Sequence, residues 1–232
     1  MSHRIDPALS IYGLDFIVHL GDHLKKIVLL IAALCCVVLC SSAMAAEKTS
    51  VPKITILKAD SGKNLSQMLS EENFTLYSAT DTFGLSGMAI GEAVKFTAPN
   101  PGWKLMALQF VGWTGFNNTT QRFPADRNVL VEVRDKDLNL LYKFADAQNM
   151  YFASTNTPVI TGMEIPSLPV TGDFYVVFYD RGSMVLGMES APGNETSKSF
   201  FFGNGQLFPA EFTNKKTNET FKANWVIRAI GA

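Results

Sequence analysis

The chain has little cysteine or histidine, and all of it lies near the start. The three cysteines and three histidines all precede Ser41. Beyond that point the sequence offers no Cys or His nucleophile and none of the usual zinc and copper ligand sets. It also offers no disulfide there, although a domain of this size can bury an adequate core without one.

The chain also lacks a surplus of either charge. Its formal net charge is −1, and residues 1–45 carry as many acidic as basic side chains. Without basic surplus there is nothing to hold a phosphate backbone, so we expect no nucleic-acid partner. A Gly-x-Ser-x-Gly elbow is absent too, and we therefore predict that the protein is not an enzyme.

The first 45 residues have the order of an export leader. Lys25 and Lys26 precede an uncharged apolar run, Ile27 to Leu39, and Ala43-Met44-Ala45 follows with small residues. This order predicts a signal peptide cut after Ala45 and an extracellular or cell-envelope location. The alternative is an uncleaved signal anchor, with membrane contact only through residues 27–46.

The rest of the chain is expected to form one all-β domain, residues 54–232, after a polar tether at 46–53. Short β-rich runs recur between turn signals, which indicates an antiparallel β-sandwich, jelly-roll-like in type. One helix is expected within Asn64–Glu72. The expected strands are Ile54–Leu57, Ala93–Ala98, Leu105–Trp113, Val129–Arg134, Leu140–Phe144, Val159–Ile165, Phe174–Tyr179, Val185–Met188, Phe200–Phe202 and Trp225–Ala229.

Two tryptophans are the candidate ligand-binding residues. Trp103 follows Pro99-Asn100-Pro101-Gly102, and Trp113 precedes a Gly-Asn segment, so both are expected at loop edges. Flat aromatic rings that are exposed can stack on sugar rings. The alternative is that both indoles pack in the core.

A metal site is the second candidate. Asp135, Asp137 and Asn139 alternate as oxygen ligands do at the start of a calcium loop, but Leu140 occupies the sixth position, where an EF-hand needs Gly. The alternative is a solvated hairpin tip. No other cofactor is expected; a structural calcium ion held by acids from separate strands, such as Asp173, Asp180 and Glu189, stays open.

Glycosylation acceptors are the third group of candidate site residues. Asn-x-Ser/Thr triplets in expected turns are candidate acceptors if the organism glycosylates exported proteins. These begin at Asn64, Asn117, Asn118, Asn194 and Asn218.

Four stretches carry a resemblance to known proteins: Val94–Pro99, Val129–Asp135 with Leu141-Tyr142, Gly172–Val177 and Trp225–Gly231. On these strand and turn patterns, residues 90–231 resemble exported archaeal and bacterial β-sandwich modules. The resemblance implies a jelly-roll-like sandwich, in some cases an accessory module of surface proteins, and assigns no functional residue.

Together these features predict an exported, non-catalytic β-sandwich that binds a cell-surface glycan through Trp103 and Trp113. The alternative is a structural or protein-interaction subunit of the envelope, and a carboxylate-based hydrolase is third. The glycan hypothesis requires both indoles to be accessible on one face.

Overall fold

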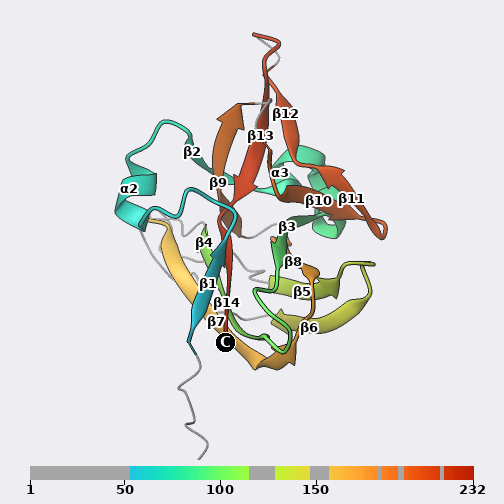
Figure 1. The fold of residues 1–232 in the computed structure, drawn as a ribbon. Coiled ribbons are helices and arrows are strands. Elements are labelled where there is room, and N and C mark those ends of the chain that lie inside the picture. Colours follow the sequence, from blue (N-terminus) through green and yellow to red (C-terminus); the bar gives the residue numbers. More distant parts are fainter. Residues whose placement is uncertain (1–52, 115–128, 147–156, 182–183, 193–195, 215–216) are drawn as a thin grey trace, which may run out of the picture. The chain divides into compact units, whose positions relative to one another are not determined.

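Two antiparallel sheets form the described part of the chain, which is residues 53–114, 129–146, 157–181, 184–192, 196–214 and 217–232 of a computed structural model (Figure 1). All strand pairings in these residues are antiparallel. The expected all-β sandwich is confirmed. The leader, residues 1–45, lies outside the described residues.

Sheet A is the larger sheet. Its strands run in the order β1 (Thr55–Lys58), β14 (Ile227–Gly231), β4 (Lys104–Trp113), β9 (Val185–Pro192), β13 (Thr220–Trp225) and β12 (Glu211–Thr213), with β2 (Phe74–Tyr77) on β9 and β7 (Val159–Pro169) on β4.

Sheet B packs against it. Its order is β11 (Gln206–Pro209), β10 (Ser199–Gly203), β3 (Gly91–Thr97), β8 (Asp173–Tyr179), β5 (Val129–Asp135) and β6 (Leu140–Asp146). The expected hairpin is formed by β5 and β6. The fully apolar run Phe174–Tyr179 lies in β8, a central strand between β3 and β5.

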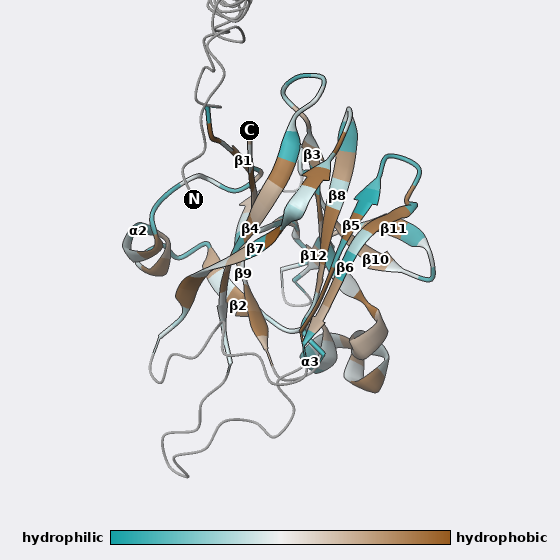
Figure 2. Ribbon diagram, turned by 90° about the horizontal axis from the view of Figure 1, so that it is seen from below, coloured by the Kyte–Doolittle hydropathy of each residue, from teal (hydrophilic) through white to brown (hydrophobic). Residues whose placement is uncertain are grey.

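The main core lies between the sheets and follows the alternation of the strands. Val129, Val131 and Val133 of β5 point into it, whereas Leu130 belongs to a second apolar cluster with Val177 on the outer face of sheet B. Figure 2 shows the two groups of strands beside each other.

The helices are short and lie at the surface of the sandwich. Helix α2 (Leu65–Leu69) covers the outer face of sheet A, where Met68 packs on Val111 and Val226 (Figure 2). Helix α3 (Ala79–Phe83) leads into the 3₁₀ helix η1 (Gly84–Ala89). None of the helices in the described residues is long and apolar enough to cross a membrane.

One sequence expectation needed correction. The expected terminal strand Trp225–Ala229 is wrong, because the chain changes partner at Val226: β13 pairs with β9, and β14 pairs with β4. The short helix expected within Asn64–Glu72 is confirmed as α2, which is capped by reciprocal hydrogen bonds between Asn64 and Gln67.

Candidate functional site

The two candidate tryptophans do not form one surface. Trp103 is 1% exposed, and its ring packs 6.0 Å from that of Phe174. The expectation that it is an exposed loop residue is wrong, because Gly231 leaves space for the indole: a Cβ there would lie 2.4 Å from the ring. Trp113 is half-buried at the far end of the ten-residue strand β4, about 30 Å along the strand from Trp103.

The three candidate calcium ligands form the β5–β6 turn. Asp135 Oδ1 accepts the backbone N–H groups of Asp137 (2.9 Å) and Asn139 (2.8 Å), and its Oδ2 accepts Asn139 Nδ2 (2.9 Å). The hydrogen bond from the Asn139 side chain is the main reason that the pKa of Asp135 is lowered. Asp137 pairs with Lys136. The Asp135 oxygens are therefore occupied by hydrogen bonds within the turn. The described residues contain no group of three acidic, His or Cys side chains placed to hold a metal.

The candidate glycosylation sites are only partly described. Asn218 is exposed, with φ +58° in the turn before β13. Asn64 caps α2, where its Oδ1 accepts the Gln67 N–H at 3.0 Å. The candidates Asn117, Asn118 and Asn194 lie outside the described residues.

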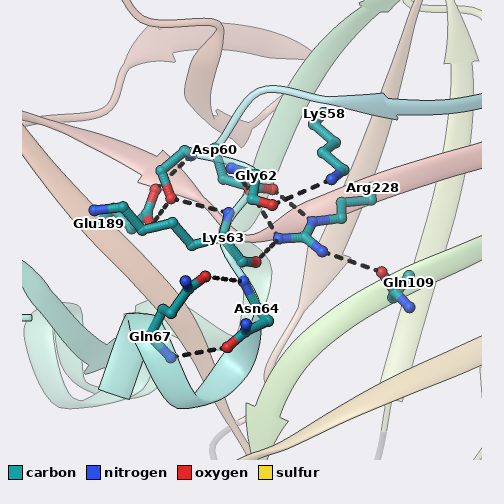
Figure 3. A network of polar contacts seen from close by, with 10 residues as sticks. Lys58, Asp60, Gly62, Lys63, Asn64, Gln67, Gln109, Glu189 and Arg228 are labelled. Atoms are coloured by element: carbon teal, nitrogen blue, oxygen red, sulfur yellow. Dashed lines mark hydrogen bonds and ion pairs between the residues drawn. The ribbon is translucent and has the colours of Figure 1, made fainter. Parts of the chain in front are cut away.

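A polar network that the sequence did not reveal joins residues 60–63 to the outer face of sheet A (Figure 3). Arg228 on β14 forms a two-pronged ion pair with Asp60, Nε to Oδ2 at 3.0 Å and Nη2 to Oδ1 at 2.9 Å. Their side chains are 7% and 0% exposed. Arg228 also donates hydrogen bonds to the Lys63 carbonyl and to the Gln109 side chain. The Glu189 carboxylate accepts hydrogen bonds from the backbone N–H and the hydroxyl of Ser61. These contacts are a structural clamp, which we call the Arg228 clamp.

A second polar network covers the outer face of sheet B. Glu132 Oε2 accepts Arg134 Nε (2.9 Å) and Nη2 (2.7 Å) and the Tyr179 hydroxyl (3.1 Å). The Arg134 guanidinium also lies 4.6 Å from the centre of the Phe202 ring. These groups are partnered within the sheet, as expected of a structural network.

A buried acid without partners lies in the core of the sandwich. Glu92 on β3 is 0% exposed, and neither carboxyl oxygen has a hydrogen-bond partner among the described residues. Its pKa is raised well above the ordinary value, first by burial and then by Asp180. Register explains the pairing: Glu92 stands opposite Phe178, so Asp180, two residues on, is its diagonal neighbour on the same face.

Asp180 itself holds helix α3. Its Oδ2 accepts the Ala79 N–H at 2.8 Å, and its Oδ1 accepts the Thr80 hydroxyl at 3.3 Å. The hydroxyl of Tyr77 is also buried; burial is the main reason that its pKa is raised, Thr82 acts in the opposite direction, and Glu92 and Asp180 add smaller effects. Among the acids scattered through the sequence, Glu92 and Asp180 are thus brought together, but both are 0% exposed.

An open apolar hollow of about 270 Å³ lies beside this buried acid, between α3–η1 and the β10–β11 hairpin. Asn204 and Gly205 make the tight hairpin turn with φ of +51° and +76°. This turn places Phe208 opposite Phe201, and the Phe83 ring meets Phe201 edge-on at 5.6 Å. We call this site the Phe208 groove; it is lined by Phe83, Ile90, Phe201, Gly203, Asn204 and Phe208.

The groove is apolar and open to solvent at both walls. Phe83 is 42% exposed and Phe208 is 50% exposed, and Leu85, at the start of η1, is 84% exposed. Asn204 is the polar side chain in the lining. Exposed apolar surface of this kind is typical of binding surfaces.

Comparisons with known proteins show no family for this chain. Neither a protein-family model nor a curated protein matches the chain. A solved structure, the cysteine protease and lectin-like domains of Cwp84, a surface layer associated protein of Clostridium difficile, is similar with a TM-score of 0.33 and 14% identity. The match covers 69% of this chain and 36% of that chain, so the chain spans about a third of that structure's length. A likeness at this TM-score carries no argument, and membership of an exported jelly-roll group stays a prediction.

Proposed function

We propose that this chain is an exported, non-catalytic module of the cell envelope that binds an extended segment of a protein partner. The Phe208 groove carries the proposal, because it combines exposed aromatic walls with a free strand edge. β11 lies at the end of sheet B and pairs only with β10 among the described strands. An extended peptide could add to this edge and place an apolar side chain in the groove.

The chemistry of the groove favours a peptide over a sugar. Sugar recognition requires several hydrogen-bonding groups that converge on the ligand. The lining supplies one polar side chain, Asn204, and four apolar ones. A glycan bound by Trp103 and Trp113 is also disfavoured, because Trp103 is buried. The structural or protein-interaction alternative is therefore the function that we propose.

The groove and the first described strand of the sandwich lie in different regions of the described domain. The chain enters the sandwich at Thr55, which pairs with Gly231 beside Trp103. The residues that line the groove lie near Gly91, which begins β3 and pairs with Phe202.

The remaining parts of the proposal rest on the sequence and on burial. Export rests on the order of residues 1–45. The absence of catalysis is proposed because Glu92 and Asp180 are both sealed from substrate. We likewise propose no cofactor, since Asp135 already uses both carboxylate oxygens in its turn, and no nucleic-acid partner.

Site-specific photocrosslinking in the source organism tests the function. A benzophenone amino acid is placed at Phe208, and at Leu140 as the control, because that apolar residue on β6 has a similar exposure of 48% against 50%. We expect an adduct from position 208 and not from 140 that protease digestion removes and that mass spectrometry identifies as one envelope protein. An adduct that resists protease but yields to glycosidases would restore the glycan hypothesis, and no adduct would contradict the groove.

A further inference from the structure

The wall of the Phe208 groove is held next to the buried acid. Asp180 binds the first turn of α3 through Ala79 and Thr80. Arg181, the next residue, donates to the carbonyl of Met88 in η1 at 3.3 Å. The two helices also touch each other directly, since a Cβ on Gly87 would lie 2.2 Å from the Ala79 carbonyl oxygen. The α3–η1 wall is therefore tied to the sandwich at the end of β8.

Glu92 lies next to Asp180, which makes two of these contacts. It pairs in register with Phe201, a lining residue of the groove, and with Phe178 on its other side. The titratable groups that face it are Asp180 from the end of β8 and Tyr77 from β2. Its carboxyl oxygens have no hydrogen-bond partner among the described residues. A carboxyl group in such a place is stable when it is neutral and costly when it is charged.

Ionisation would place a second negative charge beside Asp180. No basic side chain among the described residues is bonded to Glu92, so relief requires that water reach it. The neighbouring strands β3 and β8 are paired on both sides. The five residues of α3 and six of η1 have no such ladder, and they are the part that can move at the lowest cost.

We propose that the proton on Glu92 is a latch for the α3–η1 wall: the wall stays docked while Glu92 is neutral and is released when it ionises. The latch regulates the Phe208 groove, and its effect on binding rests on the proposed function. Release moves Phe83 and Ile90 away from Phe201, so partner binding weakens as the pH rises.

Hydrogen exchange measured on the purified protein over a pH series tests the latch. Protection factors are corrected for intrinsic exchange and compared between residues 79–90 and residues 65–69 of α2, another short surface helix. In the opened wall Glu92 has an ordinary pKa of about 4.3, so rising pH favours opening. Protection of residues 79–90 should fall about tenfold per pH unit from there to the raised pKa of the docked form. Protection of residues 65–69 should not change.

Two variants sharpen the result. Glu92→Gln keeps the shape but cannot ionise, and protection of residues 79–90 should lose its dependence on pH. Glu164→Gln, the same change at an exposed residue of β7, should behave as the wild type. A parallel fall of protection in residues 79–90 and 65–69 would overturn the latch. Equal pH dependence of protection in residues 79–90 of the wild type and of Glu92→Gln would also overturn it. If Glu92→Gln fails to fold, the comparison of the two segments in the wild type decides.

This test is independent of the partner. A pH-dependent wall without a crosslink from position 208 would refute the proposed function and leave the latch. A crosslink from position 208 without a pH-dependent wall would support the proposed function and refute the latch.

Discussion

Two buried carboxyl groups, Asp60 and Glu92, have opposite surroundings. Asp60 receives both prongs of the Arg228 guanidinium and the N–H of Gly62. Glu92 has no partner among the described residues, and its diagonal neighbour carries another carboxyl group. The first arrangement holds a loop on sheet A through a buried ion pair. The second is favourable while the Glu92 carboxyl keeps its proton, so the region around Glu92 is expected to respond to pH.

The difference extends to the surfaces that each region supports. The Arg228 clamp fixes a segment that covers sheet A, and Met68 of α2 is 0% exposed beneath it. The region around Glu92 supports a wall whose Phe83 is 42% exposed. One region of the described fold is thus held by a buried ion pair, and the other supports the surface that we propose for partner contact.

Replacing Arg228 by methionine should have the largest effect on stability. It leaves the Asp60 carboxylate, 0% exposed, without its cation, and loss of one partner of a buried pair costs about 3–5 kcal/mol. Urea denaturation would show this as a lower midpoint. The control Lys136→Met removes a cation that is 69% exposed and should leave the midpoint near that of the wild type. Equal shifts in the two variants would refute the clamp.

Replacing Gly87 by alanine should loosen the wall without touching the acid. The new Cβ would lie 2.2 Å from the Ala79 carbonyl oxygen, and overpacking of this kind costs about 1–3 kcal/mol. Gly162→Ala on β7 is the matched control, because a Cβ added there would meet no atom within 4 Å. Thermal melts of both variants give the comparison; an unchanged Gly87→Ala protein would show that the helices are not packed as described.

Replacing Glu92 by glutamine should remove a pH dependence of stability. Above about pH 4.3 the unfolded chain loses the glutamate proton while the folded chain keeps it. The folded state then binds more protons, and its free energy of unfolding falls by about 1.4 kcal/mol per pH unit until the raised pKa is reached. Urea midpoints across the pH range should show this slope in the wild type and in Glu164→Gln. The same slope in Glu92→Gln would assign it to another group.

Adding calcium should have the smallest effect. Asp135 already accepts hydrogen bonds at both oxygens, and Asp137 pairs with Lys136. We expect the same Tm in calcium and in chelator. A rise in Tm with calcium that Asp137→Asn abolishes would restore the metal site.

The strands could be predicted because their signals are local. In β5, the alternation of Val129, Val131 and Val133 with Glu132 and Arg134 already assigns each side chain to a face. The turn residues Asp135 and Asn139 likewise mark the hairpin. Such patterns depend on neighbours within a few positions, so one sequence is sufficient to read them.

The sites could not be predicted in this way, because contacts distant in the sequence decide them. Trp103 follows a loop, but its burial depends on the space that Gly231 provides. The Phe208 groove brings Phe83 together with Phe201 and Phe208, which are distant from it in the sequence. The sequence indicates only the β10–β11 hairpin, through the Asn204-Gly205 turn. Neither the isolation of Glu92 nor the pairing of Asp60 with Arg228 leaves any local sign.

The protonation state of Glu92 at neutral pH is the most direct test of this account. Its ¹³C carboxyl chemical shift, assigned by comparison with Glu92→Gln, can be followed by NMR across a pH titration. The account predicts the shift of a neutral carboxylic acid at pH values where an exposed glutamate is already ionised, and a transition well above that of an exposed glutamate. A carboxylate at pH 7 with a transition near about pH 4.3 would contradict it, and with it the proton-held wall of the Phe208 groove.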